Sequence, residues 1–133
     1  MADKKSMKNL KPVKGMELEG GDKLERIMAM QLSFMERIGI HPDKMPLAER
    51  ERVTKEVVLA MHDELSEVLN WTNWKPWKKE RTEVDQHEIR FEIIDLLHFL
   101  LELAAVWGMT ADDVAAYYIA KNRENQKRQD DGY

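Results

Sequence analysis

Residues 89–105 are apolar on nearly every face of the helix that they would form, and this constrains the fold more than any other feature of the chain. A helix that is apolar all round has to be covered on several sides, so it is predicted to be central. After Arg90, ionisable side chains interrupt the segment only at Glu92, Asp95, His98 and Glu102. A chain of 133 residues can hardly supply that cover alone. We therefore expect a homodimer or a higher homo-oligomer.

Helical periodicity runs through the rest of the chain, and no alternating strand pattern appears. A first helix is expected from Asp22 to Gly39, because aspartate is a common N-cap and glycine a common stop. A second helix is expected from Leu47 to about Asn73, because Pro76 disfavours the α conformation in the residue before it.

The third helix, which contains the apolar segment, is predicted from near Asp85 to Trp107, with Gly108 as its stop. A fourth helix starts at Thr110, which forms a predicted capping box with Asp113. The sequence thus predicts an all-α fold, a bundle of about four long helices.

Length and composition limit the organisation and the partners. We assign residues 22–133 to a single helical domain, and we expect the lysine-rich residues 1–21 to form a flexible basic N-terminal tail. There is no cysteine, which excludes disulfides and thiolate metal sites. The net charge of −4 gives no reason to expect nucleic acid or an anionic membrane as a partner. No apolar run suggests a signal peptide or a membrane span, so a cytoplasmic protein is expected.

Two pairs of carboxylates, Glu64 with Glu67 and Glu92 with Asp95, point to chemistry. Residues three apart lie about 60° apart on one helix face. A lone pair of this kind is usually solvated surface, but Glu92 and Asp95 lie among apolar neighbours, where an unpaired carboxylate is costly to bury. If the two pairs converge, a cation is expected between them. A set of four oxygen donors suits Mg²⁺ or Mn²⁺ better than zinc.

Residues 70–79, between the two pairs, contain three of the four tryptophans. Trp71 is as well explained by a plug at the end of a bundle as by a role in a site. Trp74 and Trp77 alternate with lysines, and flat rings beside cations suit a base and its phosphates.

The C-terminal segment offers a second basic surface. Lys121, Asn125 and Arg128 are spaced so that they share one helix face. This face is either a solvated helix end, where the helix dipole favours cations, or a surface that binds phosphates.

Taken together, the motifs resemble those of the dimeric all-α dUTPases, within the all-α NTP pyrophosphatase (MazG-like) superfamily. The resemblance covers residues from about 24 to the C-terminus and rests on the two acidic pairs, on the tryptophan–lysine segment and on the basic C-terminal run. It implies that the metal ligands are Glu64, Glu67, Glu92 and Asp95, and that Glu67 also orients the attacking water. It further implies phosphate binding by Lys78, Lys121, Asn125, Arg128 and Tyr133, and a nucleoside pocket lined by Gln31, Trp74 and His98.

The function implied by the resemblance is Mg²⁺-dependent hydrolysis of dUTP to dUMP and pyrophosphate, with Mn²⁺ as a substitute. Long members of the family carry inserted helices that form a mobile cap, for which this chain has little room. Short members of the superfamily include dCTP-directed and less selective pyrophosphatases, so both remain alternatives. A non-catalytic helical dimerisation or adaptor module is a further alternative, but it does not explain acids within apolar helix faces.

Overall fold

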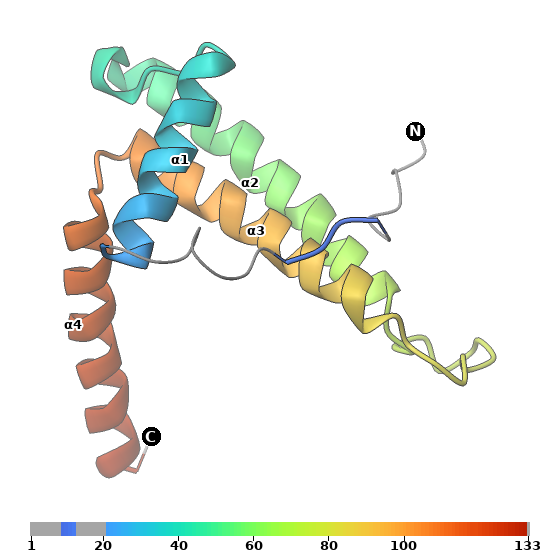
Figure 1. Cartoon of the computed structure of the whole chain (residues 1–133). Coiled ribbons are helices and arrows are strands. Elements are labelled where there is room, and N and C mark those ends of the chain that lie inside the picture. The colour runs from blue at the N-terminus through green and yellow to red at the C-terminus, as the bar shows by residue number, and fades with distance from the viewer. Residues whose placement is uncertain (1–8, 13–20, 133) are drawn as a thin grey trace.

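The computed structural model describes residues 9–12 and 21–132, and all regular secondary structure within them is helical. The helices are α1 (Lys23–Arg37), the short 3₁₀ helix η2 (Pro42–Lys44), α2 (Leu47–Asn70), α3 (Gln86–Val106) and α4 (Ala111–Asp130) (Figure 1). The predicted all-α fold with four long helices is confirmed. The predicted N-terminal tail lies mostly outside the described residues.

Local side-chain caps explain where three helices begin. The Asp22 carboxylate accepts hydrogen bonds from the backbone N–H groups of the first turn of α1, and Asp85 does the same for α3. Thr110 and Asp113 form the complete capping box that was predicted for α4. Because these bonds span only two or three residues, they are encoded locally.

Helix α2 ends at Asn70, which is earlier than the expected end near Asn73. The Thr72 backbone N–H donates to the Leu69 carbonyl oxygen at 2.9 Å, and the Thr72 hydroxyl donates to the same oxygen at 2.7 Å. These bonds close the last turn with an i−3 pattern, so the helix does not continue.

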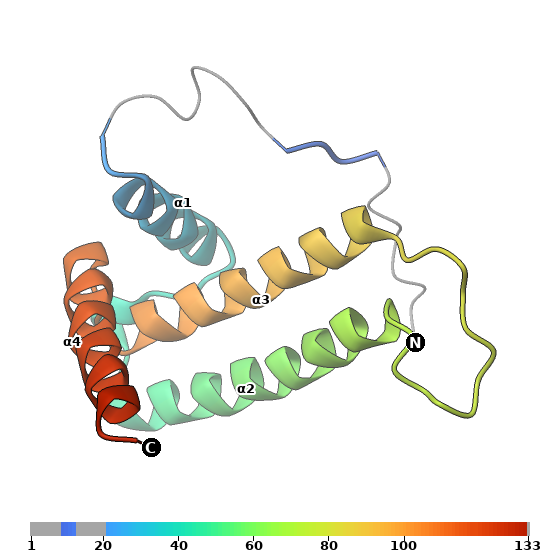
Figure 2. The same cartoon turned by 90° about the horizontal axis from the view of Figure 1, so that it is seen from below.

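Helices α2 and α3 lie side by side and antiparallel, α1 packs across α3, and α4 packs against α1 (Figures 1 and 2). The core that they share is small and contains methionines from α1, valines from α2 and the C-terminal end of α3. Arg50 connects the α1–α2 loop to this core through its guanidinium group. It donates to the carbonyl oxygens of Pro42 and Met45 in the loop and of Val106 at the end of α3. Helix α4 contributes no buried residue.

One face of α3 remains uncovered in the single chain. Ile93 and Leu100 are about half exposed, whereas Leu101 and Val106 are buried against the other helices. Within the described part of the chain, no single helix has the length and apolar composition needed to cross a membrane. Only α3 and α4 together meet that criterion, and they are bent by 104°.

Candidate active site

Three of the four predicted metal ligands come together between α2 and α3. Glu64 from α2 and Glu92 and Asp95 from α3 each offer a carboxylate oxygen within 4.8 Å of the others. We call these three residues the acid cluster. Glu92 is only 1% exposed, and the other two are partly buried. Carboxylates this close repel one another unless protons or a cation intervene. The acid cluster could therefore hold a metal ion, and its donors are all oxygen, which suits a hard divalent cation.

Trp71, at the C-terminal end of α2, contacts the acid cluster. The Trp71 Nε1–H donates to Glu92 Oε1 at 3.4 Å. Trp71 therefore has a polar contact in the site, which a purely hydrophobic plug would not make.

Two further acids lie near the cluster. Glu67 is partly buried one turn beyond Glu64, but it is not one of the three that converge, so its role stays a prediction. Glu88 was not singled out from the sequence, yet it is 2% exposed and lies one turn before Glu92 on the same face of α3. Its i−4 spacing from Glu92 was the signal that could have identified it.

Gln31 and His98, both predicted to line a nucleoside pocket, contact each other. Gln31 Oε1 lies 3.2 Å from His98 Nδ1, and Gln31 is buried. Both line a cavity of about 350 Å³ between α1 and α3 whose other walls are apolar, formed by Ile27, Met30, Phe34, Ile94, Leu97 and Leu101. His98 follows Asp95 by three residues on α3. The polar end of this cavity is therefore one helical turn from the acid cluster.

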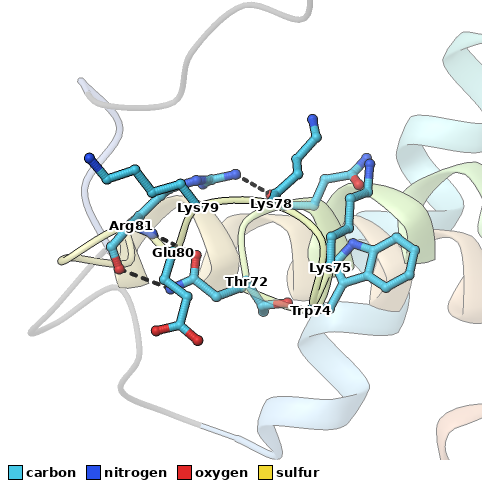
Figure 3. Close-up of a pocket in the computed structure, with 9 residues that line it drawn as sticks. Thr72, Trp74, Lys75, Lys78, Lys79, Glu80 and Arg81 are labelled. Atoms are coloured by element: carbon cyan, nitrogen blue, oxygen red, sulfur yellow. Dashed lines mark hydrogen bonds between the residues drawn. The ribbon is translucent and has the colours of Figure 1, made fainter.

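The loop between α2 and α3 forms a second, basic pocket of about 260 Å³ (Figure 3). Trp74 and Lys78, both predicted site residues, line it together with Lys75, Lys79 and Arg81. We call these five residues the loop pocket.

Side-chain contacts hold the loop pocket in shape. The Asn73 amide donates to the Arg81 carbonyl oxygen at 2.9 Å, and the Arg81 backbone N–H donates to Asn73 Oδ1 at 3.1 Å. The Arg81 guanidinium donates to the Asn70 carbonyl oxygen at 2.7 Å (Figure 3). Lys75 Nζ lies 5.3 Å from the centre of the Trp74 ring, a cation–π distance.

Sequence analysis did not single out Lys79 or Arg81. The signal that could have found them is the density of cations in residues 75–81, directly before α3. A loop with four cations and one acid gathers positive charge at the end of α2, which is suited to an anion with several negative groups.

The predicted phosphate-binding residues of α4 lie elsewhere. Lys121, Asn125 and Arg128 are exposed on the C-terminal half of α4, which projects away from the α2–α3 pair (Figure 1). Arg128 Nε donates to Glu124 Oε1 at 3.1 Å. Within one chain they are not brought to the acid cluster, and their role stays a prediction. Tyr133 lies outside the described residues.

Two carboxyl groups away from the acid cluster have shifted pKa values. Burial raises the pKa of Glu102 on α3, which lines a cavity with Glu49, Arg52 and Glu56 of α2. Hydrogen bonds from the Thr110 backbone and side chain lower the pKa of Asp113. Asp113 is therefore ionised at neutral pH, as an acid in the first turn of a helix is favoured to be.

Comparison with known proteins agrees with this arrangement. The dUTPase family model matches residues 23–107 and 100–133. The chain belongs to the all-α dUTPase family. The predicted family is thereby confirmed, and the match to this dUTPase family includes the acid cluster, the loop pocket and α4. No solved structure matches the chain.

Phage proteins are among its relatives. The chain is 29% identical over 134 residues to the dCTP pyrophosphatase of Enterobacteria phage T4, which covers 83% of this chain and 78% of that protein. It is 42% identical over 71 residues to the dCTP pyrophosphatase of Enterobacteria phage LZ5, covering 45% of this chain and 41% of that protein. A DNA replication protein of phage T4 is 27% identical over 124 residues, covering 75% of this chain and 32% of that protein. These relatives and the family match support a nucleotide pyrophosphatase.

Proposed function

We propose that this chain is a Mg²⁺-dependent pyrophosphatase that hydrolyses dUTP to dUMP and pyrophosphate. The observation that carries the proposal is the adjacency of the acid cluster to the Gln31–His98 cavity, one helical turn apart along α3. A nucleoside triphosphate needs both features next to each other, because its base is flat and apolar and its phosphates are held through divalent cations.

The polar end of the cavity suits the edge of a pyrimidine. With Gln31 Oε1 accepting from the Nδ1–H of His98, the Gln31 amide still has N–H groups to donate and His98 Nε2 has a lone pair to accept. Uracil offers an acceptor, O4, beside a donor, N3–H. A donor and an acceptor held side by side therefore match that edge, while the apolar walls enclose the ring.

The acid cluster fits a hard divalent cation by its donor type and by the closeness of its oxygens. Mg²⁺ bound there would supply positive charge to the phosphate oxygens and would make water more acidic. Glu67, which is next to the cluster and not within it, remains available to take the proton from the attacking water. Trp71 holds the Glu92 carboxylate in place through its indole N–H.

The loop pocket supplies the remaining positive charge within the same chain. Lys78 and its neighbouring cations lie at the end of α2, beyond Glu64 and Glu67. Cations placed there can stabilise the negative charge that develops on the leaving pyrophosphate.

A second candidate substrate is dCTP. The observation that favours it is that the phage T4 and LZ5 relatives are dCTP pyrophosphatases. Cytosine presents the donor and the acceptor in the opposite order, N4–H₂ beside N3. A flip of the Gln31 amide together with the other tautomer of His98 would match it, because Gln31 Oε1 would then accept from N4–H₂ and His98 Nε2–H would donate to N3.

The protein is proposed to act as a homodimer. Among the described residues, eight hydrophobic residues are buried, whereas twenty-one large ones are exposed, including Ile93, Ile94, Leu97 and Leu100 along one side of α3. A soluble chain rarely exposes a contiguous apolar surface of this kind unless another protein surface covers it.

The test is pyrophosphate release from dUTP, dCTP, dTTP, dATP and dGTP, each with Mg²⁺ and with a chelator. We expect metal-dependent turnover that is highest with dUTP. Highest turnover with dCTP would support the second candidate instead. Absence of turnover with all five substrates would contradict the proposed reaction.

A further inference from the structure

Lysines and apolar residues each recur with a period of three near the N-terminus. The lysines are Lys5, Lys8 and Lys11, and Met7 and Leu10 have the same spacing. A polyproline II helix has three residues per turn, so in that conformation the lysines share one edge of the chain and the apolar residues share the next edge. Pro12 favours this conformation, because it fixes its own φ and biases the residue before it towards extended backbone. We call residues 5–12 the basic strip.

The described end of the basic strip lies on the side of α3 where α1 also lies. Residues 9–12 run along the N-terminal half of α3 on that side (Figures 1 and 2). Residues 10–12 belong to neither a helix nor a strand, Lys11 is exposed and Leu10 is 52% exposed. In this part of the strip, both edges are therefore available for a further contact.

The acid cluster faces the same side of α3. His98 contacts Gln31 of α1, and Asp95 lies one turn before His98 on the same face of α3. Asp95 is therefore also on the α1 side. Because Asp95 and Glu64 are only partly buried, the acid cluster can be contacted from that side.

Charge favours a contact between the basic strip and the acid cluster. Residues 1–12 contain four lysines and one aspartate, a formal charge of +3, so the other residues carry −7 within the total of −4. The acid cluster holds three carboxylates within 4.8 Å of one another. Lysine ammonium groups placed among them relieve their mutual repulsion. Because the strip belongs to the same chain, its local concentration at the cluster is on the order of millimolar.

The surroundings of the acid cluster match the apolar edge of the strip. The Gln31–His98 cavity is one helical turn from Asp95, and its walls include Met30 and Ile94. Both of these wall residues are exposed. An anionic group beside an apolar wall is complementary to a chain that has a cationic edge beside an apolar edge.

We propose that the basic strip docks on the acid cluster of its own chain when no metal is bound, with its lysines against the carboxylates and Leu10 against the apolar wall. The inference rests on the proposed function in one respect, because it takes the acid cluster as the Mg²⁺ site. Mg²⁺ then has to displace the strip. If the strip occupies the cluster in about nine of ten metal-free molecules, Mg²⁺ binds about tenfold more weakly than it binds to an open cluster.

Zero-length cross-linking tests the docking without any catalysis. A carbodiimide joins a lysine amine to a carboxylate that it contacts, and mass spectrometry of the peptides identifies the pair. In the metal-free full-length chain, we expect lysines of the basic strip to be joined to the acid cluster within one chain, and we expect excess Mg²⁺ to suppress this product. Cross-links only to other acids, or a product that Mg²⁺ leaves unchanged, would overturn the inference. A covalent dimer would place the strip on a second copy and would overturn its assignment to the same chain.

A calorimetric titration with Mg²⁺ measures the competition. The triple variant Lys5→Gln, Lys8→Gln, Lys11→Gln should bind Mg²⁺ about tenfold more tightly than the wild type at low salt. The difference should disappear in 1 M salt, where the Debye length is about 3 Å. The matched control removes three exposed lysines elsewhere, by Lys23→Gln, Lys44→Gln and Lys55→Gln, and should change the affinity little. Equal effects from the two triple variants, or no tighter binding by the first, would overturn the inference.

The cross-link also separates this inference from the proposed reaction. A protein that gives the Mg²⁺-sensitive cross-link but hydrolyses none of the five triphosphates would contradict only the proposed reaction. A protein that hydrolyses dUTP but gives no such cross-link would contradict only the docking of the basic strip.

Discussion

Trp71 Nε1 lies 3.4 Å from Glu92 Oε1, so an indole at the end of α2 donates a hydrogen bond to the most buried carboxylate of the acid cluster. The loop that carries the predicted substrate contacts begins at this residue. This hydrogen bond therefore connects the α2–α3 loop to the acid cluster.

Removing the Trp71 N–H donor should leave the Glu92 carboxylate less firmly positioned and should weaken metal binding by the acid cluster. Trp71→Phe keeps an aromatic ring and removes the N–H, and a lost hydrogen bond to a charged group costs about 1.5 kcal/mol at the lower end of its range. We expect weaker Mg²⁺ binding, by roughly tenfold, in a calorimetric titration. Trp107→Phe is the matched control, because it removes an indole bond to Thr54 at 2.9 Å, away from the acids. Equal effects from both changes would contradict the proposed link.

Asp95 and Glu67 should separate metal binding from proton transfer. Both Asp95→Asn and Glu67→Gln should lower kcat by roughly 10²-fold or more. Only Asp95→Asn relieves repulsion within the acid cluster. Only this variant should therefore have a higher thermal midpoint without metal, from a free energy of unfolding that is about 1 kcal/mol larger. Scanning calorimetry in a chelator measures this. A midpoint that rises equally in both variants would mean that Glu67 shares the repulsion.

Removing Mg²⁺ should destabilise the wild-type protein, and the loss should be larger the more tightly the acid cluster binds the ion. At a hundredfold excess over the dissociation constant, a ligand that binds only the folded state adds about 2.7 kcal/mol. We expect chelation to lower the thermal midpoint of the wild type and to leave that of Asp95→Asn nearly unchanged. A midpoint of the wild type that ignores Mg²⁺ would argue against a metal at the acid cluster.

Gln31 should control the choice between uracil and cytosine. Gln31→Leu removes the amide and leaves the cavity apolar, so the discrimination that its hydrogen bonds supply should be lost. We expect the ratio of kcat/KM for dUTP and dCTP to change by roughly tenfold, while Arg128→Ala lowers both values by a similar factor. Met30→Leu, in the same cavity, is the control. If Gln31→Leu leaves the ratio of kcat/KM for dUTP and dCTP unchanged, the base does not bind in the Gln31–His98 cavity.

Glu102 should weaken the fold at neutral pH. Burial raises its pKa in the folded protein above the unfolded value, so the folded state is favoured while Glu102 is protonated, and this advantage is lost as the pH rises through the folded pKa. Glu102→Gln should therefore stabilise the protein at pH 7, by about 0.5 kcal/mol because the group is partly solvated. The gain should disappear below about pH 4.5, the unperturbed value. Urea unfolding at the two pH values measures it.

A charge on the uncovered side of α3 should break the dimer. Leu100→Lys should yield monomers in sedimentation at micromolar concentration, because a lysine charge is costly to bury against a second copy of the chain. Leu47→Lys, which is exposed on α2, should leave the dimer intact. A Leu100→Lys chain that still sediments as a dimer would contradict the proposed interface.

Features encoded by neighbouring residues could be predicted from the sequence, whereas features set by packing between helices could not. The starts at Asp22, Asp85 and Thr110 depend on bonds within a single turn. The face shared by Glu92 and Asp95 follows from helical period alone. Which acids converge depends on the register of α2 against α3, and this register brings in Glu64 rather than Glu67.

The shape of the loop pocket and the direction of α4 could not be predicted from sequence patterns, although Trp74 and Lys78 in that pocket were. Asn73 and Arg81 bond across eight residues of irregular chain, for which there is no periodic signal. Periodicity places Arg128 on a face of its helix, but it says nothing about the angle at which that helix leaves α3.

That angle is set by a short connection, in which Gly108 has a φ of +74° and Thr110 starts the next helix. The direction of α4 therefore depends on a backbone conformation that glycine adopts without strain and other residues rarely adopt. Arg128 lies about 25 Å along α4, so a change of about 10° in that direction would move it by about 4 Å. A side chain at position 108 would thus displace the basic end of a helix about twenty residues further along the chain.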